Sequence, residues 1–256
     1  MNDLICGNNI DVLKTFPDEY IDLTVTSPPY DKLRQYNGFS FDFEGLAEQL
    51  YRVTKKGGVV VWVVGDSVKN RNESGTSFKQ ALYFKDCGFK LHDTMIYQKN
   101  GSSIPSPKIT KTYFQSFEYM FVFSKGDIKT WNLICDSKNK TSGSKYKSHG
   151  RTGDGESVKY FNVGIVPEYS IRGNIWFYDN RIGVTTSDKI AYKHPAIFSE
   201  KLAEDHIISW SNEGDVVLDP FVGSGTTCKM AKQLGRNYIG IDISQEYINI
   251  SKERLK

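Results

Sequence analysis

Residues 23–30, LTVTSPPY, join an apolar run to groups that can bind an amino group. Pro29 restricts Pro28 to extended geometry, so the carbonyl groups around them are held in fixed directions. These oxygens and the Ser27 hydroxyl accept hydrogen bonds without being strong bases. Such acceptors suit the weakly nucleophilic amino group of a heterocycle, and Tyr30 offers an aromatic face on which that ring can stack. The alternative interpretation is an edge strand that ends at two prolines.

Residues 219–227, DPFVGSGTT, form a second stretch suited to chemistry, a glycine turn between an apolar run and a helical pattern. Gly223 and Gly225 let the backbone approach a ligand, because no Cβ intervenes and a positive φ costs little. Asp242 follows Asp219 by 23 residues, where doubly wound folds place an acid that binds ribose hydroxyls. This turn lacks the third glycine of the dinucleotide-binding fingerprint, and no GxxxxGK[ST] phosphate loop occurs in the chain. The acid that opens the turn therefore favours S-adenosylmethionine, a cation, over NAD; a tight loop without a ligand is the alternative.

Short apolar runs alternate with amphipathic stretches along most of the chain, and they predict the elements that position these residues. Strands are predicted at 4–6, 23–26, 59–64, 91–97, 119–123, 216–219 and 238–242. Helices are predicted at 11–15, 43–54, 77–86, 197–209, 226–234 and 245–255. This alternation favours a doubly wound α/β fold, a mostly parallel sheet with helices on both faces. Both stretches then lie at the carboxyl ends of strands, where open α/β folds bind ligands.

Length and charge favour one catalytic domain that contains a basic insert. A chain of 256 residues can bury a sizeable core, and 39% hydrophobic with 25% charged residues excludes the disordered and fibrous classes. Between residues 125 and 181, ten Lys and Arg accompany six Asp and Glu, whereas the whole chain carries only +3. Residues 128–173 lack periodic runs, so we interpret them as an inserted module or a segment that a ligand orders. A basic segment of this kind suits a nucleic-acid surface, although a solvated face would look the same.

The sequence predicts neither a metal site nor a membrane segment. Its four cysteines are far apart without a CxxC pair, and its four histidines add no metal-type spacing. No apolar run approaches the roughly 20 residues of a membrane span, and the first residues, MNDLICGNN, lack the layout of a signal peptide. We therefore expect no metal, no disulfide framework, no membrane contact and a cytoplasmic location.

TSPPY and DPFVGSGTT together resemble the motifs of amino-group DNA methyltransferases, and their order along the chain resembles the beta group of that family. The resemblance covers nearly the whole chain. Further similar segments are ICGNNIDVL at 5–13, LYRVTKKGGVVVW at 50–62, SFEYMFVFSKG at 116–126 and KHPAIF at 193–198. The chain departs from the family's pattern at Asn8, where an acid is common. That departure puts the contact of this position with the cofactor adenine in question.

This resemblance implies a Rossmann-like methyltransferase fold with a seven-stranded, mostly parallel sheet. It implies a catalytic half at 1–126, a target-recognition insert at 127–187 and a cofactor-binding half at 188–256. The implied catalytic residues are Ser27, Pro28, Pro29 and Tyr30. The implied residues for S-adenosylmethionine, whose product is S-adenosylhomocysteine, are Cys6, Asn8, His194, Pro195, Asp219, Pro220, Phe221, Gly223, Gly225, Thr226 and Asp242. The residues expected to contact double-stranded DNA are Lys145, Lys147, Arg151 and Arg172.

The activity implied by the resemblance is base flipping followed by direct methyl transfer, because the amino group of a paired base is buried in the duplex. Its hydrogens would meet Ser27 and the Pro28 carbonyl, which frees the nitrogen lone pair for attack. No Pro-Cys dipeptide occurs for methylation at carbon 5 of cytosine. In the family, Ser before Pro-Pro-Tyr usually accompanies the 4-amino group of cytosine, and a hydroxyl can donate as well as accept. We therefore predict 4-methylcytosine, with the 6-amino group of adenine as the alternative.

Three other classes are weighed against this interpretation. A protein-glutamine methyltransferase uses an Asn-Pro-Pro-Tyr loop, but its cofactor turn normally precedes that loop. An RNA or small-molecule methyltransferase would need the same cofactor half without a large basic insert. A catalytically silent DNA-binding module would tolerate the loss of Ser27 or Asp219, and both are present. The resemblance predicts association with the nucleoid, and leaves open whether the protein forms a homodimer or belongs to a restriction-modification pair with a cognate endonuclease.

Overall fold

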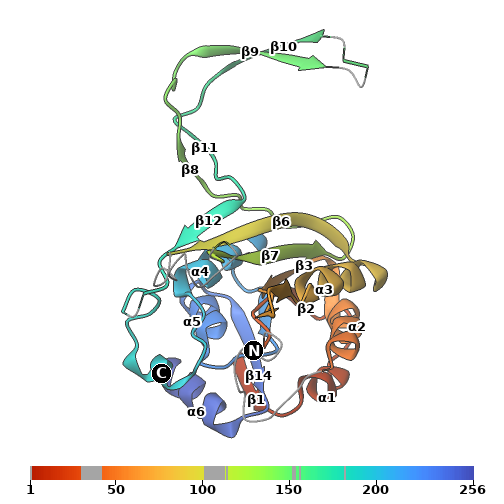
Figure 1. The fold of residues 1–256 in the computed structure, drawn as a ribbon, viewed down its shortest axis with the longest axis vertical. Coiled ribbons are helices and arrows are strands. Elements are labelled where there is room, and N and C mark those ends of the chain that lie inside the picture. The colour runs from red at the N-terminus through yellow and green to blue at the C-terminus, as the bar shows by residue number, and fades with distance from the viewer. Residues whose placement is uncertain are drawn as a thin grey trace. The chain divides into compact units, whose positions relative to one another are not determined.

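The chain folds into two units, and Figure 1 labels most of their elements. The first unit comprises residues 1–132 and 174–256, and the second comprises residues 133–173. The computed structural model describes residues 2–29, 42–100, 113, 115–151, 154–155, 157–181 and 183–256, and of residues 147–151 and 158–163 it describes the backbone.

Eight of the described strands form one sheet in the first unit, in the order β1-β14-β13-β2-β3-β7-β6-β12. They are β1 (Asn2–Cys6), β2 (Ile21–Thr26), β3 (Thr54–Val64), β6 (Lys90–Lys99), β7 (Phe117–Ser124), β12 (Ile175–Tyr178), β13 (Val216–Asp219) and β14 (Asn237–Asp242). Strand β7 runs antiparallel to β3 and β6, and the other neighbours are parallel. Residues 59–64 of β3 are all buried, as expected for a strand covered on both faces. A short hairpin, β4 (Val68–Lys69) and β5 (Asn72–Glu73), follows β3.

Helices cover both faces of this sheet, as Figure 1 shows. On one face lie α1 (Asn9–Lys14), α2 (Phe43–Val53) and α3 (Thr76–Asp86). On the other lie α4 (Glu200–Trp210), α5 (Thr226–Gln233) and α6 (Gln245–Arg254), with the 3₁₀ helix η1 (Lys189–Lys193) before α4. Under α1–α3, an aromatic core contains Trp62, Phe84 and Phe123, and the Trp62 indole donates to Gln80 Oε1 over 2.8 Å. None of the described helices is long and apolar enough to cross a membrane.

Helix α2 illustrates how the sequence forms these elements. Asp42 caps it by accepting a hydrogen bond from the Gly45 backbone N–H over 3.1 Å. Its buried residues Leu46, Leu50 and Val53 recur at helical spacing, so one face packs on the sheet and the other meets solvent. The helix ends where the chain turns into the buried strand β3.

The second unit consists of two antiparallel strand pairs. Strand β8 (Cys135–Lys138) pairs with β11 (Tyr169–Ile171), and β9 (Lys145–Arg151) pairs with β10 (Ser157–Ile165). Several apolar side chains among the described residues of this unit are exposed, including Ile165 at 67% and Ile171 at 57%. No residue of β8 or β11 is buried. A strand without a buried face gives no alternating hydrophobic pattern, which explains why the sequence did not predict these two strands.

The predicted α/β fold is confirmed, and each predicted strand and helix of the first unit has a counterpart within a few residues. The sheet has eight described strands rather than the predicted seven, because β12 adds to β6 at its edge. Residues 175–178 therefore belong to the sheet, although the insert was predicted to span 127–187. Helix α4 begins at Glu200, three residues later than predicted, after Ser199 at its N-cap.

Candidate active site

A cavity of about 760 Å³ lies at the carboxyl ends of the parallel strands in the first unit. Residues of both predicted motifs line it, because β2 and β13 are neighbours in the sheet and point the same way. From the first motif come Ser27, Pro28 and Pro29. From the second come Asp219, Pro220, Phe221, Val222, Gly223, Ser224 and Thr226. One cavity thus places weak hydrogen-bond acceptors and a glycine turn around the same space.

A buried hydrogen bond joins the two motifs. Thr26 Oγ1 donates to Asp219 Oδ1 over 2.7 Å, and the Phe221 backbone N–H donates to the same oxygen over 3.1 Å. Asp219 is only 5% exposed. Burial raises the pKa of Asp219 to about 6, although the hydrogen bond from Thr26 acts in the opposite direction. The site therefore presents a buried carboxylate that is ready to receive a cationic group near neutral pH.

The glycine turn is held against the end of β14. Gly223 has φ +49°, and its N–H donates to Asp242 Oδ2 over 3.0 Å. The other oxygen of Asp242 accepts from the Ser244 N–H over 2.9 Å, and burial raises the pKa of this carboxyl group. A Cβ on Gly223 would lie 2.8 Å from His194 Nε2. Glycine is therefore required both by the backbone angle and by the close approach of the histidine ring.

His194 closes this side of the cavity together with an aromatic residue that the sequence analysis did not identify. The rings of His194 and Tyr247 meet edge to face, with centroids 4.5 Å apart. Tyr247 belongs to α6 and lines the cavity. Its only signal in the sequence is its place two residues into the helix that follows Asp242. Aromatic rings of this kind can pack against the flat or apolar parts of a nucleoside cofactor.

The predicted cofactor residues mostly come together. Those that line the cavity are Asn8, His194, Pro195, Asp219, Pro220, Phe221, Gly223, Thr226 and Asp242. Cys6 and Gly225 are not among the described residues of its wall. Cys6 is exposed, and Gly225 packs so closely on α6 that a Cβ would lie 2.8 Å from Ser251 Oγ. Asn8 caps α1 through its side-chain oxygen, which accepts from the Ile10 N–H over 2.9 Å. Tyr30, the predicted stacking residue, lies outside the described residues.

The wall formed by β6 and β7 carries polar groups that the sequence analysis also missed. Lys99 forms an ion pair with Glu118, and both residues line the cavity beside Tyr97. Burial raises the pKa of the Tyr97 hydroxyl. Asp66, after β3, also lines the cavity, and it accepts a hydrogen bond from the Ser77 N–H over 3.0 Å. No three His, Cys, Asp or Glu side chains in the described ranges are placed to hold a metal ion.

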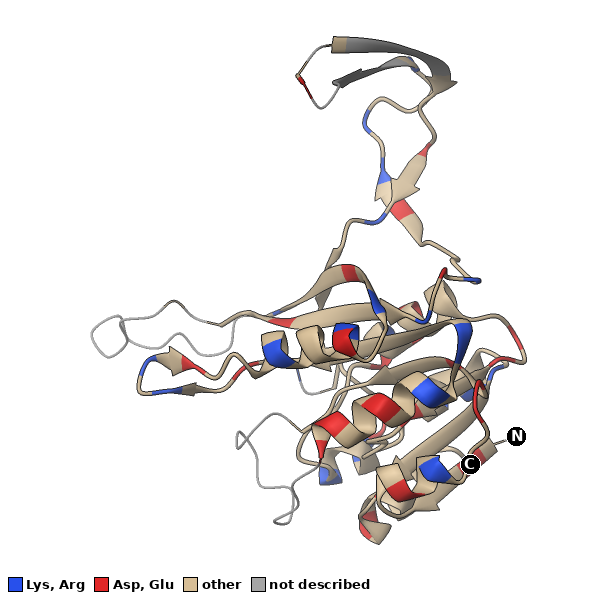
Figure 2. Cartoon of the chain, turned by 90° about the vertical axis from the view of Figure 1, so that its right-hand side faces the viewer, with Lys and Arg blue, Asp and Glu red and all other residues tan. Residues whose placement is uncertain are grey.

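The predicted DNA-contacting residues lie in the second unit. Lys145 is exposed at the start of β9, and Lys147 and Arg151 belong to the same strand. The Arg172 guanidinium is held by the carboxylate of Asp136, with Nε 3.0 Å from Oδ2. Residues 133–173 contain seven Lys and Arg against four Asp and Glu, and Figure 2 shows charges of both signs on this unit. Its net charge is therefore positive.

Comparison with known proteins places the chain in an enzyme family. Residues 21–253 match the family model described as DNA methylase. The orphan methyltransferase M.BamHII of Bacillus amyloliquefaciens is 60% identical over 238 residues, which are 92% of this chain and 89% of that protein. The solved structure of the PvuII DNA methyltransferase (cytosine-N4-specific) has a TM-score of 0.71 at 20% identity, over all of this chain and 86% of that one. The structure of the M1.HpyAVI–SAM complex has a TM-score of 0.65 at 25% identity, over the whole of both chains.

Proposed function

The chain belongs to the DNA methylase family, and from this premise we propose that it methylates the 4-amino group of a flipped cytosine in double-stranded DNA. Methylation of an amino group in DNA is the activity of the family, and the same reaction on the 6-amino group of adenine is the alternative. The observation that carries the proposal is the hydrogen bond between Thr26 and Asp219, which fixes the Ser-Pro-Pro segment beside the glycine turn.

The cavity fits S-adenosylmethionine as the methyl donor. Asp219 offers a buried carboxylate for a cation, and Gly223 allows close approach of the backbone. Both oxygens of Asp242 accept backbone N–H groups, and because a carboxylate has about four acceptor positions it can also accept from ribose hydroxyls. His194 and Tyr247 supply aromatic surface beside the turn. When bound, S-adenosylmethionine supplies an electrophilic methyl group.

Ser27, Pro28 and Pro29 provide the polar groups of the methyl-acceptor site. The amino hydrogens of the flipped base are accepted by the Ser27 hydroxyl and the Pro28 carbonyl, and this favours a tetrahedral nitrogen with a free lone pair. Pro29 holds the Pro28 carbonyl in place, so little reorganisation is needed when the base arrives. Catalysis then consists of positioning and preorganised polarity, without a covalent intermediate on the protein.

Cytosine is favoured because Ser27 occupies the position before Pro-Pro. A hydroxyl can accept one amino hydrogen and still donate its own proton, whereas a carboxylate can only accept. The ring nitrogen beside the amino group, N3 of cytosine or N1 of adenine, is an acceptor that such a proton can reach, so the choice of cytosine rests on the usual pairing of Ser with cytosine in this family. We assign recognition of the surrounding duplex to residues 133–173, with Lys145, Lys147 and Arg151 at the phosphates. Arg172, directly after β11, is bound to Asp136 of β8 and has a structural role in this assignment.

The test is to methylate unmodified duplex DNA with S-adenosylmethionine, digest it to nucleosides and identify the products by mass spectrometry. We expect 4-methylcytosine from the wild-type protein, and a loss of at least about tenfold in rate for Ser27→Ala, since one hydrogen bond to the reacting group is removed. Methyladenine as the sole product would overturn the cytosine assignment and leave the reaction class intact. The absence of any methylated nucleoside, with DNA from several sources, would overturn the proposed reaction.

A further inference from the structure

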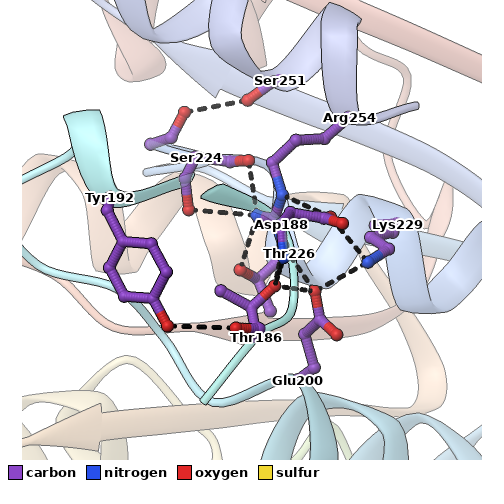
Figure 3. Close-up of polar contacts among 10 residues, drawn as sticks. Thr186, Asp188, Tyr192, Glu200, Ser224, Thr226, Lys229, Ser251 and Arg254 are labelled. Carbon is purple, nitrogen blue, oxygen red and sulfur yellow. Dashed lines mark hydrogen bonds and ion pairs between the residues drawn. The ribbon is translucent and has the colours of Figure 1, made fainter. Parts of the chain in front are cut away.

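Arg254, in the last turn of α6, has a completely buried guanidinium group, whose polar contacts are drawn in Figure 3. Its side chain is 0% exposed and lies among polar groups from three separate segments of the first unit. A charge in such a place costs desolvation free energy unless many hydrogen bonds compensate it. The contacts of Arg254 show where that compensation comes from.

One nitrogen of the Arg254 guanidinium binds the cofactor turn. Nη1 donates to the Ser224 carbonyl oxygen over 2.7 Å, and lies 3.2 Å from Ser224 Oγ and 3.0 Å from Thr226 Oγ1. Ser224 and Thr226 both line the cavity. The same helix reaches the turn a second time, because Ser251 Oγ donates to the Gly223 carbonyl oxygen over 2.8 Å. Helix α6 thus binds the turn at Gly223, Ser224 and Thr226.

The other two nitrogens of Arg254 bind the segment before α4 and the first residue of that helix, Glu200. Nε donates to Asp188 Oδ2 over 3.1 Å, and Nη2 lies 2.5 Å from Glu200 Oε1 and 3.3 Å from Thr186 Oγ1. Lys229 of α5 shares these acidic partners, at 2.7 Å from Asp188 and 2.8 Å from Glu200. Two cations and two anions therefore balance in one network, which Figure 3 shows together.

This segment also forms part of the cavity wall. The Tyr192 hydroxyl donates to the Thr186 carbonyl oxygen over 3.0 Å and accepts from the Gly183 N–H over 2.6 Å. Tyr192 and His194 line the cavity. The Thr186 hydroxyl in turn donates to Glu200 Oε1 over 2.7 Å. Arg254 therefore connects two walls that come from residues 183–200 and 223–226.

We propose that Arg254 is a positioning residue for cofactor binding, whose guanidinium holds the glycine turn and residues 186–200 in the arrangement that receives S-adenosylmethionine. The inference rests on the proposed cofactor. A turn with two glycines at positive φ has little conformational preference of its own, so its binding geometry must be imposed by neighbours. The planar guanidinium suits this task because its donors point in fixed directions toward both walls at once.

Three variants test this role by calorimetric titration with S-adenosylmethionine and by thermal unfolding without it. Arg254→Gln removes the charge and most donors, and Arg254→Lys keeps the charge but cannot reach both walls. Arg236→Gln is the matched control. Its partly buried guanidinium also binds backbone, including the Ser211 carbonyl oxygen at 2.7 Å and the Leu234 carbonyl oxygen at 2.6 Å. These two residues precede β13 and β14, so this guanidinium lies at the amino ends of the strands, whereas the cavity lies at their carboxyl ends.

We expect Arg254→Gln to raise the Kd for S-adenosylmethionine by roughly tenfold or more, the effect of losing a hydrogen bond to a charged group, with Arg254→Lys between it and the wild type. The KM for the cofactor should rise by more than kcat falls. Arg236→Gln should lower the melting temperature and leave the Kd unchanged. An unchanged Kd in Arg254→Lys, or an equal rise in Arg236→Gln, would overturn the inference, even if Arg254→Gln does not fold. A wild-type protein that binds no S-adenosylmethionine would instead overturn the proposed cofactor.

Discussion

Thr26 and Asp219 are 193 positions apart in the chain, yet Thr26 Oγ1 donates a hydrogen bond to Asp219 Oδ1 over 2.7 Å. The contact exists because β2 and β13 pair in parallel, with Leu23 opposite Val217, so that both strands end at the same edge. The carboxylate that suits the cationic cofactor is thus tied to the residue directly before Ser27. The proposed methyl-donor and methyl-acceptor sites share one buried hydrogen bond, and a change in either partner should affect both.

Cofactor affinity should depend on the protonation of Asp219. Burial raises the pKa of this carboxyl group to about 6, so in the free protein it is neutral below that pH and charged above it. A cation binds the charged form, and affinity should therefore be close to its maximum at pH 7 and fall through pH 6 as the pH drops. Titration calorimetry should show that S-adenosylmethionine binds about tenfold more weakly at pH 5 than at pH 7, because the charged fraction of a group with a pKa of about 6 falls by that factor.

The Asp219→Asn variant separates this effect from other groups that titrate in the same range. It should bind the cofactor weakly, with the same affinity at pH 5 and pH 7. Equal affinities of the wild-type protein at both pH values would show that Asp219 does not bind the cation. A pH dependence that persists in the variant would assign the titration to another group.

Substitution by valine should affect stability differently at two threonines of β2. Thr26→Val removes a buried donor from the Asp219 carboxylate, and we expect a loss of about 1.5 to 3 kcal/mol in the free energy of unfolding. Thr24 is also fully buried, but within the described part of the chain its hydroxyl has no hydrogen-bond partner. Thr24→Val keeps the shape and removes this unsatisfied group, so it should leave stability unchanged or raise it by up to about 1 kcal/mol. Urea unfolding of both variants measures these changes in the free energy of unfolding. Equal losses of stability in the two variants would contradict the assigned hydrogen bond.

The sequence predicted the meeting of the two motifs because parallel strands place their carboxyl ends at one edge of a sheet. It could not predict contacts that depend on how strands align. Lys99 pairs with Glu118 because β6 and β7 are antiparallel in a particular register, in which Tyr97 lies opposite Glu118. No local pattern encodes that register. Arg254 looks in the sequence like an ordinary cation near the end of a helix, and only its tertiary contacts reveal a buried network.

Strand β12 was missed for a different reason. Its four residues alternate, with Ile175 and Phe177 more than half exposed and Trp176 and Tyr178 buried. A single such alternation after a polar segment is too short to distinguish from chance. Its place is determined by parallel pairing with β6, in which Trp176 lies opposite Tyr97. Longer elements such as α2 were predicted because their burial pattern repeats over three turns.

Gly223 should not tolerate a side chain, in contrast to a glycine with the same kind of backbone angle. Gly223→Ala adds a Cβ 2.8 Å from His194 Nε2, so either the ring or the turn must move. Gly214 also has positive φ, but a Cβ there meets nothing within 4 Å. Both variants should lose about 1 kcal/mol of stability from the backbone angle. Only Gly223→Ala should weaken cofactor binding in a calorimetric titration, and equal affinities of the two variants would contradict the assigned role of the turn.

His206 should make the protein less stable in mild acid. It is fully buried on α4 beside Trp176 and Trp210, and burial lowers its pKa to about 3. In the unfolded chain histidine titrates near pH 6.5, so the unfolded state binds more protons as the pH falls from 6.5 toward 3. Stability contributed by this group is therefore complete above about pH 6.5 and is lost below it, by up to about 1.4 kcal/mol per pH unit.

Urea unfolding at pH 7 and pH 5.5 measures this slope. Asp219 acts in the opposite direction over part of the range, because its raised pKa lets the folded state take up a proton, so the informative comparison is between wild type and His206→Asn. The variant should be less stable at pH 7 but should lose less on acidification. Identical slopes in the two proteins would exclude His206 as the acid-sensitive group.

Charge removal on β9 should weaken DNA binding and reduce its dependence on salt. Each phosphate contact by Lys or Arg releases counterions, and its loss lowers the slope of log affinity against log salt by about one. Replacing Lys145, Lys147 and Arg151 by Gln in one variant should therefore reduce the slope by up to about three.

The control variant neutralises three exposed lysines on helices of the first unit, Lys14, Lys85 and Lys252. It changes the net charge equally, so a general effect of charge would appear in both proteins. Fluorescence anisotropy with a labelled duplex at several salt concentrations gives both quantities, and unchanged cofactor affinity shows that the first unit is intact. If the β9 variant keeps the affinity and slope of the wild type, residues 133–173 are a solvated surface and another part of the chain recognises DNA.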